Sequence, residues 1–197
     1  MIDYELKYIN IQIPETGIKQ LHLQTQEGLQ QKDWQFYSNL LHDKISDFLV
    51  FSCVRNTWER FLAIYLRCKN YSLFPRIDFT EFVEDIYCSI KFSTKPCHSF
   101  YITSQLNYLS DNTGQLKCQH ILYYNNLIDD LQNLQKQTGL NIYKKVIDFE
   151  IIEDINYQSF YKPHTREMIG NLFQKEIDFF SFDFYESKKI KYPIKIT

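Results

Sequence analysis

The sequence predicts an α/β domain in which a small parallel sheet is flanked by helices. Three runs of apolar and aromatic residues are typical of strands, at Leu6–Ile13, Asp47–Val54 and Leu116–Tyr124. Segments with apolar residues at helical spacing follow them, and alternating strands and helices favour parallel pairing. The chain has 197 residues and contains neither an internal repeat nor a linker. We therefore expect one domain over residues 1–197, long enough to bury a sizeable core.

The first half of the chain supplies two of these strands. Leu6–Ile13 alternates apolar and polar residues, and a turn follows at Pro14–Gln20. The segment Asp33–Ile45 has apolar residues at helical spacing, and Asp33 is a suitable N-cap. The next strand, Asp47–Val54, is almost continuously apolar, as expected in the middle of a parallel sheet.

Four further helices are predicted downstream. One begins at Thr57, which we expect to cap it, and Ile77–Ile90 forms an amphipathic helix. Residues 93–115 are predicted to be irregular and lead to the third strand. A helix follows over Asn125–Gly139, with the glycine at its end, and the last helix, Thr165–Phe182, runs into an aromatic tail expected to pack in the core.

Composition excludes several classes of function. The chain has 22 Lys and Arg against 24 Asp and Glu, so no basic excess indicates a nucleic-acid partner. Its 5 Cys are dispersed and form no CxxC pair, which predicts reduced thiols and no metal site. No apolar run approaches the ~20 residues of a membrane span, and the N-terminus does not resemble a signal peptide. We expect a cytoplasmic protein.

The ends of the first two strands carry the candidate site. Carboxyl ends of parallel strands meet at one edge of a sheet, where ligands bind in α/β folds. The two ends read IPETG, to Gly17, and VRNTWERF, from Val54. We therefore expect Gly17 and Asn56 at the same edge. A guanidinium there suits a phosphate, which makes Arg55 a candidate anion ligand. The alternative is a strand-end arginine paired with a carboxylate. Glu59 and Arg60 are expected to form a structural ion pair or exposed helix charges.

At this point the chain resembles a known family. Four segments follow the order of motifs in sulfotransferases: IPETG, VRNTWERFLAIY, HSFYITSQLNYLSDNTGQLKCQHILYYNNL and KEIDFFSFDF. The resemblance extends from about Tyr8 to about Phe184 and is closest to the carbohydrate-type branch. It implies a P-loop-NTPase-like sulfotransferase fold. It also implies transfer of a sulfuryl group from 3′-phosphoadenosine 5′-phosphosulfate (PAPS), as co-substrate, to a hydroxyl of a small molecule or glycan.

The resemblance also implies roles for particular residues. The phosphosulfate would bind at the turn after the first strand, at Thr16, Gly17, Ile18 and Lys19. Arg55 would bind the 3′-phosphate. His98 lies in the stretch that borders the acceptor pocket in the family and would act as the base on the acceptor hydroxyl; the alternative is a loop histidine without a role.

The chain departs from the family pattern at the donor site. Glu15 stands where the family has Lys, and Ala63 where it has Ser. A carboxylate close to a phosphosulfate repels it by about 1–4 kcal/mol, so we expect Glu15→Lys to raise donor affinity at least ~10-fold. These departures support a second hypothesis, a catalytically inactive pseudo-sulfotransferase acting as a binding or scaffold module. A third, a kinase-like nucleotide-binding protein, lacks the GxxxxGK[ST] run.

Overall fold

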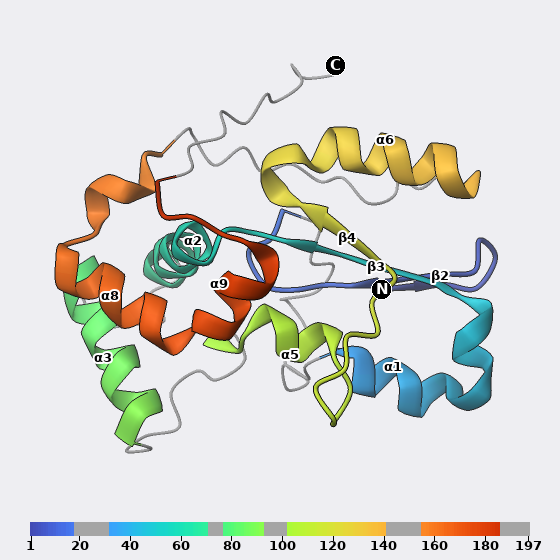
Figure 1. Ribbon diagram of the computed structural model, residues 1–197, viewed down its shortest axis with the longest axis horizontal. Helices are drawn as coiled ribbons and strands as arrows, with labels where there is room; N and C mark the ends of the chain where they lie inside the picture. The colour runs from blue at the N-terminus through green and yellow to red at the C-terminus, as the bar shows by residue number, and fades with distance from the viewer. Residues whose placement is uncertain (18–31, 71–76, 93–101, 141–154, 186–197) are drawn as a thin grey trace.

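The protein has an α/β fold with a small mixed sheet flanked by helices (Figure 1). The computed structural model describes residues 1–17, 32–70, 77–92, 102–140 and 155–185. Within these residues the sheet has four strands, in the order β1 (Ile2–Asp3), β2 (Tyr8–Ile11), β3 (Leu49–Val54) and β4 (His120–Tyr123). The three strands predicted from the sequence are β2, β3 and β4, each shorter than its apolar run.

The sheet is mixed because of β1, which the sequence did not predict. β2 pairs with β3 and β3 with β4 in parallel, as expected, whereas β1 pairs antiparallel with β2 through Ile2 and Ile9. A short turn joins β1 to β2, in which Oδ1 of Asp3 accepts from the N–H groups of Glu5 and Leu6 at 3.1 and 2.9 Å. A turn this short can connect only antiparallel strands. The prediction of a purely parallel sheet is therefore wrong at this edge.

Helices lie on both faces of the sheet and at one end of it (Figure 1). Their bounds are α1 (Trp34–Leu41), α2 (Thr57–Asn70), α3 (Phe79–Phe92), α5 (Gln105–Leu109), α6 (Leu127–Thr138), α8 (Pro163–Leu172) and α9 (Gln174–Phe180). Short 3₁₀ segments are η1 (His42–Asp47), η2 (Tyr124–Asn126) and η3 (Tyr157–Phe160). Among the described helices, none has the length and apolar character needed to cross a membrane.

The two faces of the sheet bury different side chains, because successive residues of a strand point to opposite sides. Tyr8, Phe51 and Cys53 pack against the leucines of α6. Ile9 and Val50 face the other way, toward α1, α5 and α9. Figure 1 shows α6 on one side of the sheet and these three helices on the other. Helices thus cover both faces of the sheet. The carboxyl ends of β2 and β3 lead into the turns that follow them.

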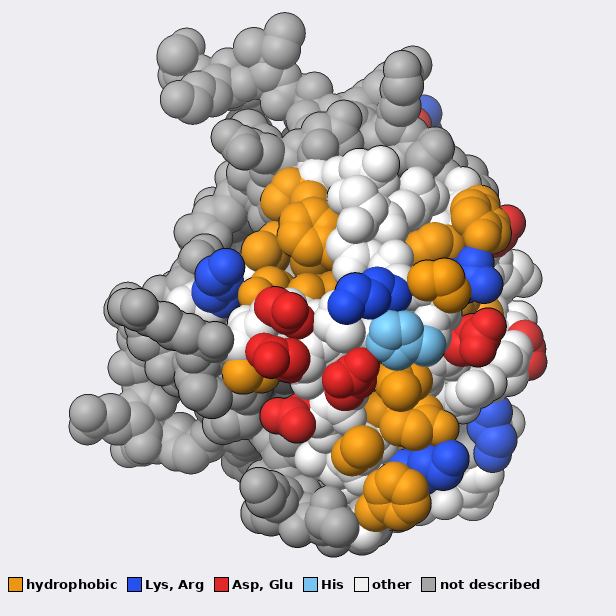
Figure 2. Space-filling model, turned by 90° about the vertical axis from the view of Figure 1, so that its left-hand side faces the viewer, with side chains coloured by type: hydrophobic (Ala, Val, Ile, Leu, Met, Phe, Trp, Pro, Cys, Tyr) orange, Lys and Arg blue, Asp and Glu red, His pale blue; other side chains and the backbone are white. Residues whose placement is uncertain are grey.

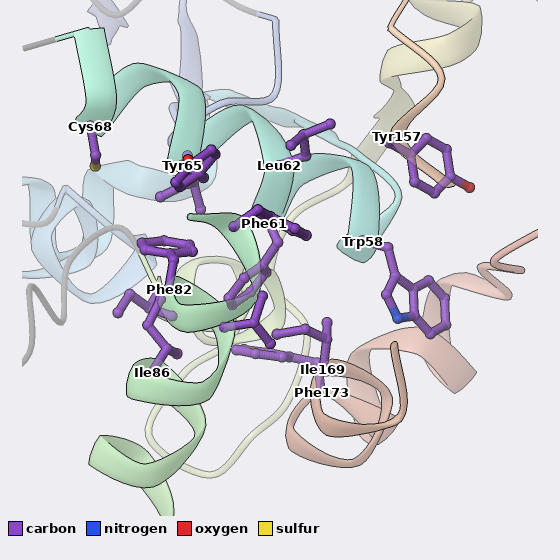
Figure 3. Packing of buried hydrophobic residues seen from close by; sticks show 14 of the residues in the cluster. Trp58, Phe61, Leu62, Tyr65, Cys68, Phe82, Ile86, Tyr157, Ile169 and Phe173 are labelled. Atoms are coloured by element: carbon purple, nitrogen blue, oxygen red, sulfur yellow. The ribbon is translucent and has the colours of Figure 1, made fainter. Parts of the chain in front are cut away.

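A third cluster of buried residues packs α2 against α3 and α8 (Figure 3). Phe61 of α2 lies 5.1 Å from Phe173, ring centroid to centroid, and Tyr65 lies 5.4 Å from Phe82. The aromatic tail joins this cluster through Phe184, as the sequence predicted. These contacts fix the orientation of α2, whose first turn carries the candidate site.

The start of α2 differs from its prediction. The cap is Asn56, whose Oδ1 accepts from the N–H of Trp58 at 3.2 Å. The Thr57 hydroxyl instead donates to the buried carboxylate of Glu176 at 2.7 Å. Asparagine and threonine both cap helices, so local sequence could not decide between them, and the distant carboxylate does.

Other helix ends follow the sequence more closely. Asp33 caps α1 by accepting from the N–H of Phe36 at 2.9 Å, and Gly139 ends α6 with φ 73°. The last predicted helix is two helices, α8 and α9, which meet at Phe173. Part of the region predicted to be irregular forms α5.

The end of the molecule that carries α3 and α8 has acidic, basic and hydrophobic side chains close together (Figure 2). Nε2 of His164 on α8 lies 3.0 Å from Oε1 of Glu84 on α3, and both side chains are nearly half exposed. A pair this exposed adds little to stability, so α3 and α8 are held mainly by their buried residues.

Candidate functional site

The turns that follow β2 and β3 meet at the carboxyl edge of the sheet, as the sequence predicted. Nη1 of Arg55 donates to the carbonyl of Glu15 at 3.2 Å, and Nε of Arg60 donates to the carbonyl of Pro14 at 2.9 Å. The two arginines therefore join the start of α2 to the turn after β2. This junction is the candidate site.

Arg55 lies at the centre of the junction and is 5% exposed. Its Nη2 is 2.8 Å from Oε1 of Glu59, and its guanidinium carbon is 4.0 Å from the ring centroid of Tyr124. Its Nε is buried and has no hydrogen-bond partner among the described residues. Burial works to lower the pKa of Arg55, but Glu59, Tyr124 and Glu15 outweigh it and raise the pKa. The arginine is thus paired with a carboxylate, and its buried Nε–H is left without an acceptor in the described part of the chain.

Glu15 occupies the position of the family lysine, and its carboxylate turns toward α2. Its Oε1 lies 2.8 Å from Nη1 of Arg67, and the glutamate side chain is 6% exposed. The backbone of Glu15 has φ 63°, a left-handed conformation that costs energy in any residue with a Cβ. Because Arg67 compensates its charge, Glu15 repels a nearby anion less than the sequence alone implied.

The backbone of the same turn presents N–H groups. The carbonyls of Pro14 and Glu15 accept from the two buried guanidinium groups, and all peptide bonds of the described residues are trans. Because a trans peptide points its N–H opposite to its carbonyl, the N–H groups of Glu15 and Thr16 point away from those arginines. The N–H groups of Glu15 and Gly17 donate to no other described residue, whereas that of Thr16 faces the carbonyl of Ile13 across the hydrogen-bonded turn. The turn therefore offers up to two backbone donors to a ligand.

Gly17 is required by both conformation and space. Its φ is 83°, and a Cβ there would come within 2.4 Å of Cε2 of Tyr124. We expect Gly17→Ala to lower the free energy of unfolding by about 2 kcal/mol, from backbone strain and overpacking. Gly114 is the matched control: its φ is 82°, but no atom of the described residues lies within 4 Å of its Cβ position, so Gly114→Ala should cost only about 1 kcal/mol. If urea unfolding shows that the two variants lose equal amounts of unfolding free energy, the close contact with Tyr124 is refuted.

Arg60 has a role that the sequence did not reveal. It was expected to pair with Glu59 or to be exposed, but its side chain is completely buried. Besides the carbonyl of Pro14, its Nη1 donates to the carbonyl of Thr103 at 3.2 Å. Burial lowers the pKa of Arg60, against the opposing effect of Glu176. Arg60 thus links α2, on which it lies, to the turn at Pro14 and to the segment at Thr103.

A buried carboxylate, Glu176 of α9, lies under the same junction. It accepts hydrogen bonds from Thr57, Ser104 and Gln105. The sequence did not single it out, because α9 reads QKEIDFF and carries other polar residues; the one signal is that Glu176 lies four residues before Phe180, on the same side of the helix.

Of the other four residues predicted for the site, the structure describes only Thr16. Ile18, Lys19 and His98 lie outside the described residues. Thr16 is buried at the junction, and its hydroxyl donates to the carbonyl of Ile13 at 2.9 Å, which closes the turn. Ala63, at the family's serine position, is buried in α2. In the described part of the chain, no group of three or more His, Cys, Asp and Glu side chains is arranged to hold a metal ion.

Comparison with known proteins identifies no relative of this chain. No family model, curated protein or solved structure matches the chain. The likeness to sulfotransferases therefore rests on the motifs of the chain itself.

Proposed function

We infer that the chain is a sulfotransferase-like protein that transfers a sulfuryl group from PAPS to a hydroxyl of a small molecule or glycan. The observation that carries this proposal is the turn after β2, where the N–H groups of Glu15 and Gly17 donate to no other described residue. Such donors at the carboxyl edge of parallel strands are a common binding site for phosphate and sulfate groups. Arg55, whose Nε has no acceptor among the described residues, lies beside them.

The chemistry assigned to this site is a displacement at sulfur. The acceptor oxygen attacks the sulfur, the bond from sulfur to the bridging oxygen breaks, and the 3′,5′-bisphosphate leaves. The acceptor proton passes to a base, a role for which the sequence offers His98. The turn would hold the phosphosulfate, and Arg55 would hold the 3′-phosphate, exchanging its contact with Glu59 for phosphate oxygens. Positioning and charge neutralisation then supply most of the catalytic effect.

Calorimetric titration with 3′-phosphoadenosine 5′-phosphate, the desulfated product, tests this proposal. We expect binding in the micromolar range, because the product retains both phosphates that the site would contact. No binding at millimolar nucleotide would reject donor binding.

A variant of Arg55 tests its assigned role. We expect Arg55→Ala to weaken binding of the bisphosphate by about 1.5–3 kcal/mol, the range for charge-assisted hydrogen bonds, and to leave binding of adenosine 5′-phosphate nearly unchanged. The matched control is Glu59→Gln, which keeps Arg55 and removes its competing carboxylate. This control should tighten binding of the bisphosphate alone. Equal losses for both nucleotides in Arg55→Ala would reject the assignment.

A second candidate function, a catalytically inactive binding or scaffold module, is favoured by the ion pairs. Glu59 binds Arg55, and Glu15 binds Arg67, so two cations near the turn are already compensated. Under this alternative the wild-type protein binds neither nucleotide, and Glu59→Gln does not restore binding.

A further inference from the structure

Glu176 is the most heavily hydrogen-bonded carboxylate at the junction, and it is 1% exposed. Its Oε1 accepts from the Thr57 hydroxyl at 2.7 Å and from Nε2 of Gln105 at 2.6 Å. Its Oε2 accepts from the Ser104 hydroxyl at 2.9 Å and from the backbone N–H of Gln105 at 2.6 Å. Four donors surround one buried charge, which compensates for much of its loss of hydration.

Gln105, in turn, binds both backbone groups of Arg55. Its Oε1 accepts from the N–H of Arg55 at 2.9 Å, and its Nε2 donates to the Arg55 carbonyl at 2.8 Å. β3 ends at Val54, where its pairing with β4 also ends. The glutamine amide therefore supplies the pair of hydrogen bonds that a neighbouring strand would otherwise give to Arg55.

The carboxylate decides which way this amide lies. A carboxylate only accepts hydrogen bonds, so the end of Gln105 that faces Glu176 must be its NH₂ group. The amide oxygen is then left facing the Arg55 N–H, and the second hydrogen of Nε2 faces the Arg55 carbonyl. The buried charge and the Arg55 backbone thus require the same amide orientation, and that amide holds the backbone from which the Arg55 side chain extends.

We propose that Glu176 and Gln105 are positioning residues of the site, which hold the Arg55 backbone so that its guanidinium lies against the turn after β2. The part of this proposal that concerns nucleotide rests on the proposed function. The part that concerns the Arg55 backbone does not, and the two parts are tested separately.

Glu176→Gln tests the backbone part with almost no change in shape. Whichever way the new amide lies, its NH₂ group faces either Nε2 or the backbone N–H of Gln105, and both of those are donors. We expect the Arg55 amide proton to exchange at least ~10-fold faster relative to that of Cys53 within β3, which reports general loss of stability.

Thr57→Val is the matched control, because it removes one hydrogen bond from Glu176 without touching Gln105. It should lower stability and leave the Arg55-to-Cys53 exchange ratio within about twofold of wild type. If Glu176→Gln fails to fold, Gln105→Met removes both bonds to the Arg55 backbone directly and should raise the same ratio. If the Arg55-to-Cys53 exchange ratio is unchanged in whichever of Glu176→Gln and Gln105→Met folds, the proposal is overturned.

A double-mutant cycle tests the nucleotide part. Glu176→Gln should weaken binding of 3′-phosphoadenosine 5′-phosphate about 10-fold, leave that of adenosine 5′-phosphate unchanged, and have no further effect once Arg55 is alanine. Equal losses for both nucleotides, or additive losses in the cycle, would overturn the positioning role while leaving the proposed function standing. If wild type binds neither nucleotide, the proposed function and the nucleotide part both fail, and the exchange ratio still decides the backbone part.

Discussion

Arg60→Met is expected to lower the free energy of unfolding by about 3–5 kcal/mol, the range for removing one partner of a buried charged network. The variant keeps most of the side-chain volume but leaves the carbonyls of Pro14 and Thr103 without these donors. It also leaves the buried carboxylate of Glu176 without the charge that opposes it. Urea unfolding at constant slope measures the loss, which is a large part of the stability of a typical domain.

Arg166→Met is the control for this prediction. Arg166 is partly exposed on α8 and contacts the tail through Tyr185 and Phe184. Its replacement should cost no more than about 1 kcal/mol. Similar losses for the two arginines would contradict the view that Arg60 holds the junction together.

Glu15→Lys is expected to destabilise the protein by about 2–4 kcal/mol, because it turns the attraction toward Arg67 into repulsion between two cations. The carboxylate of Glu15 is nearly buried and lies 2.8 Å from the arginine, so the new charge cannot easily be solvated where it starts. Thermal or urea unfolding of the variant measures this effect.

The charge-swapped variant, Glu15→Lys with Arg67→Glu, is the control for the second prediction. It restores opposite charges and should regain most of the lost stability. A swap no more stable than Glu15→Lys would show that the pair is not what the substitution disrupts. Nucleotide titration of Glu15→Lys itself tests the sequence-based prediction that a lysine at this position raises donor affinity at least ~10-fold.

Much of the fold could be predicted because its signals are local. The apolar runs of β2, β3 and β4 identify three strands, and the leucine stripe with Gly139 identifies α6. The antiparallel β1 was missed because it has only two residues, too few to show a period. The break at Phe173 was missed because the apolar spacing of α8 continues into α9.

The site was predicted only in part, for a different reason. The meeting of the two strand ends follows from parallel pairing, so Arg55 and the turn to Gly17 could be located from sequence. The partners of these residues could not, because the hydrogen bonds from Gln105 to Arg55 and Glu176 span 50 and 71 positions. Neither periodicity nor a local motif records such a pair, and its polar members resemble ordinary loop and surface residues in the sequence.

The central claim is that the turn after β2 binds the phosphate end of a nucleotide through its backbone. Amide ¹H–¹⁵N spectra recorded during titration with 3′-phosphoadenosine 5′-phosphate test it most directly. We predict that the signals of Glu15 and Gly17 move downfield and saturate with the bisphosphate, because an N–H that donates to a phosphate oxygen is strongly deshielded. Signals of these two residues that stay in place, while nucleotide at millimolar concentration shifts others or none, would contradict the account.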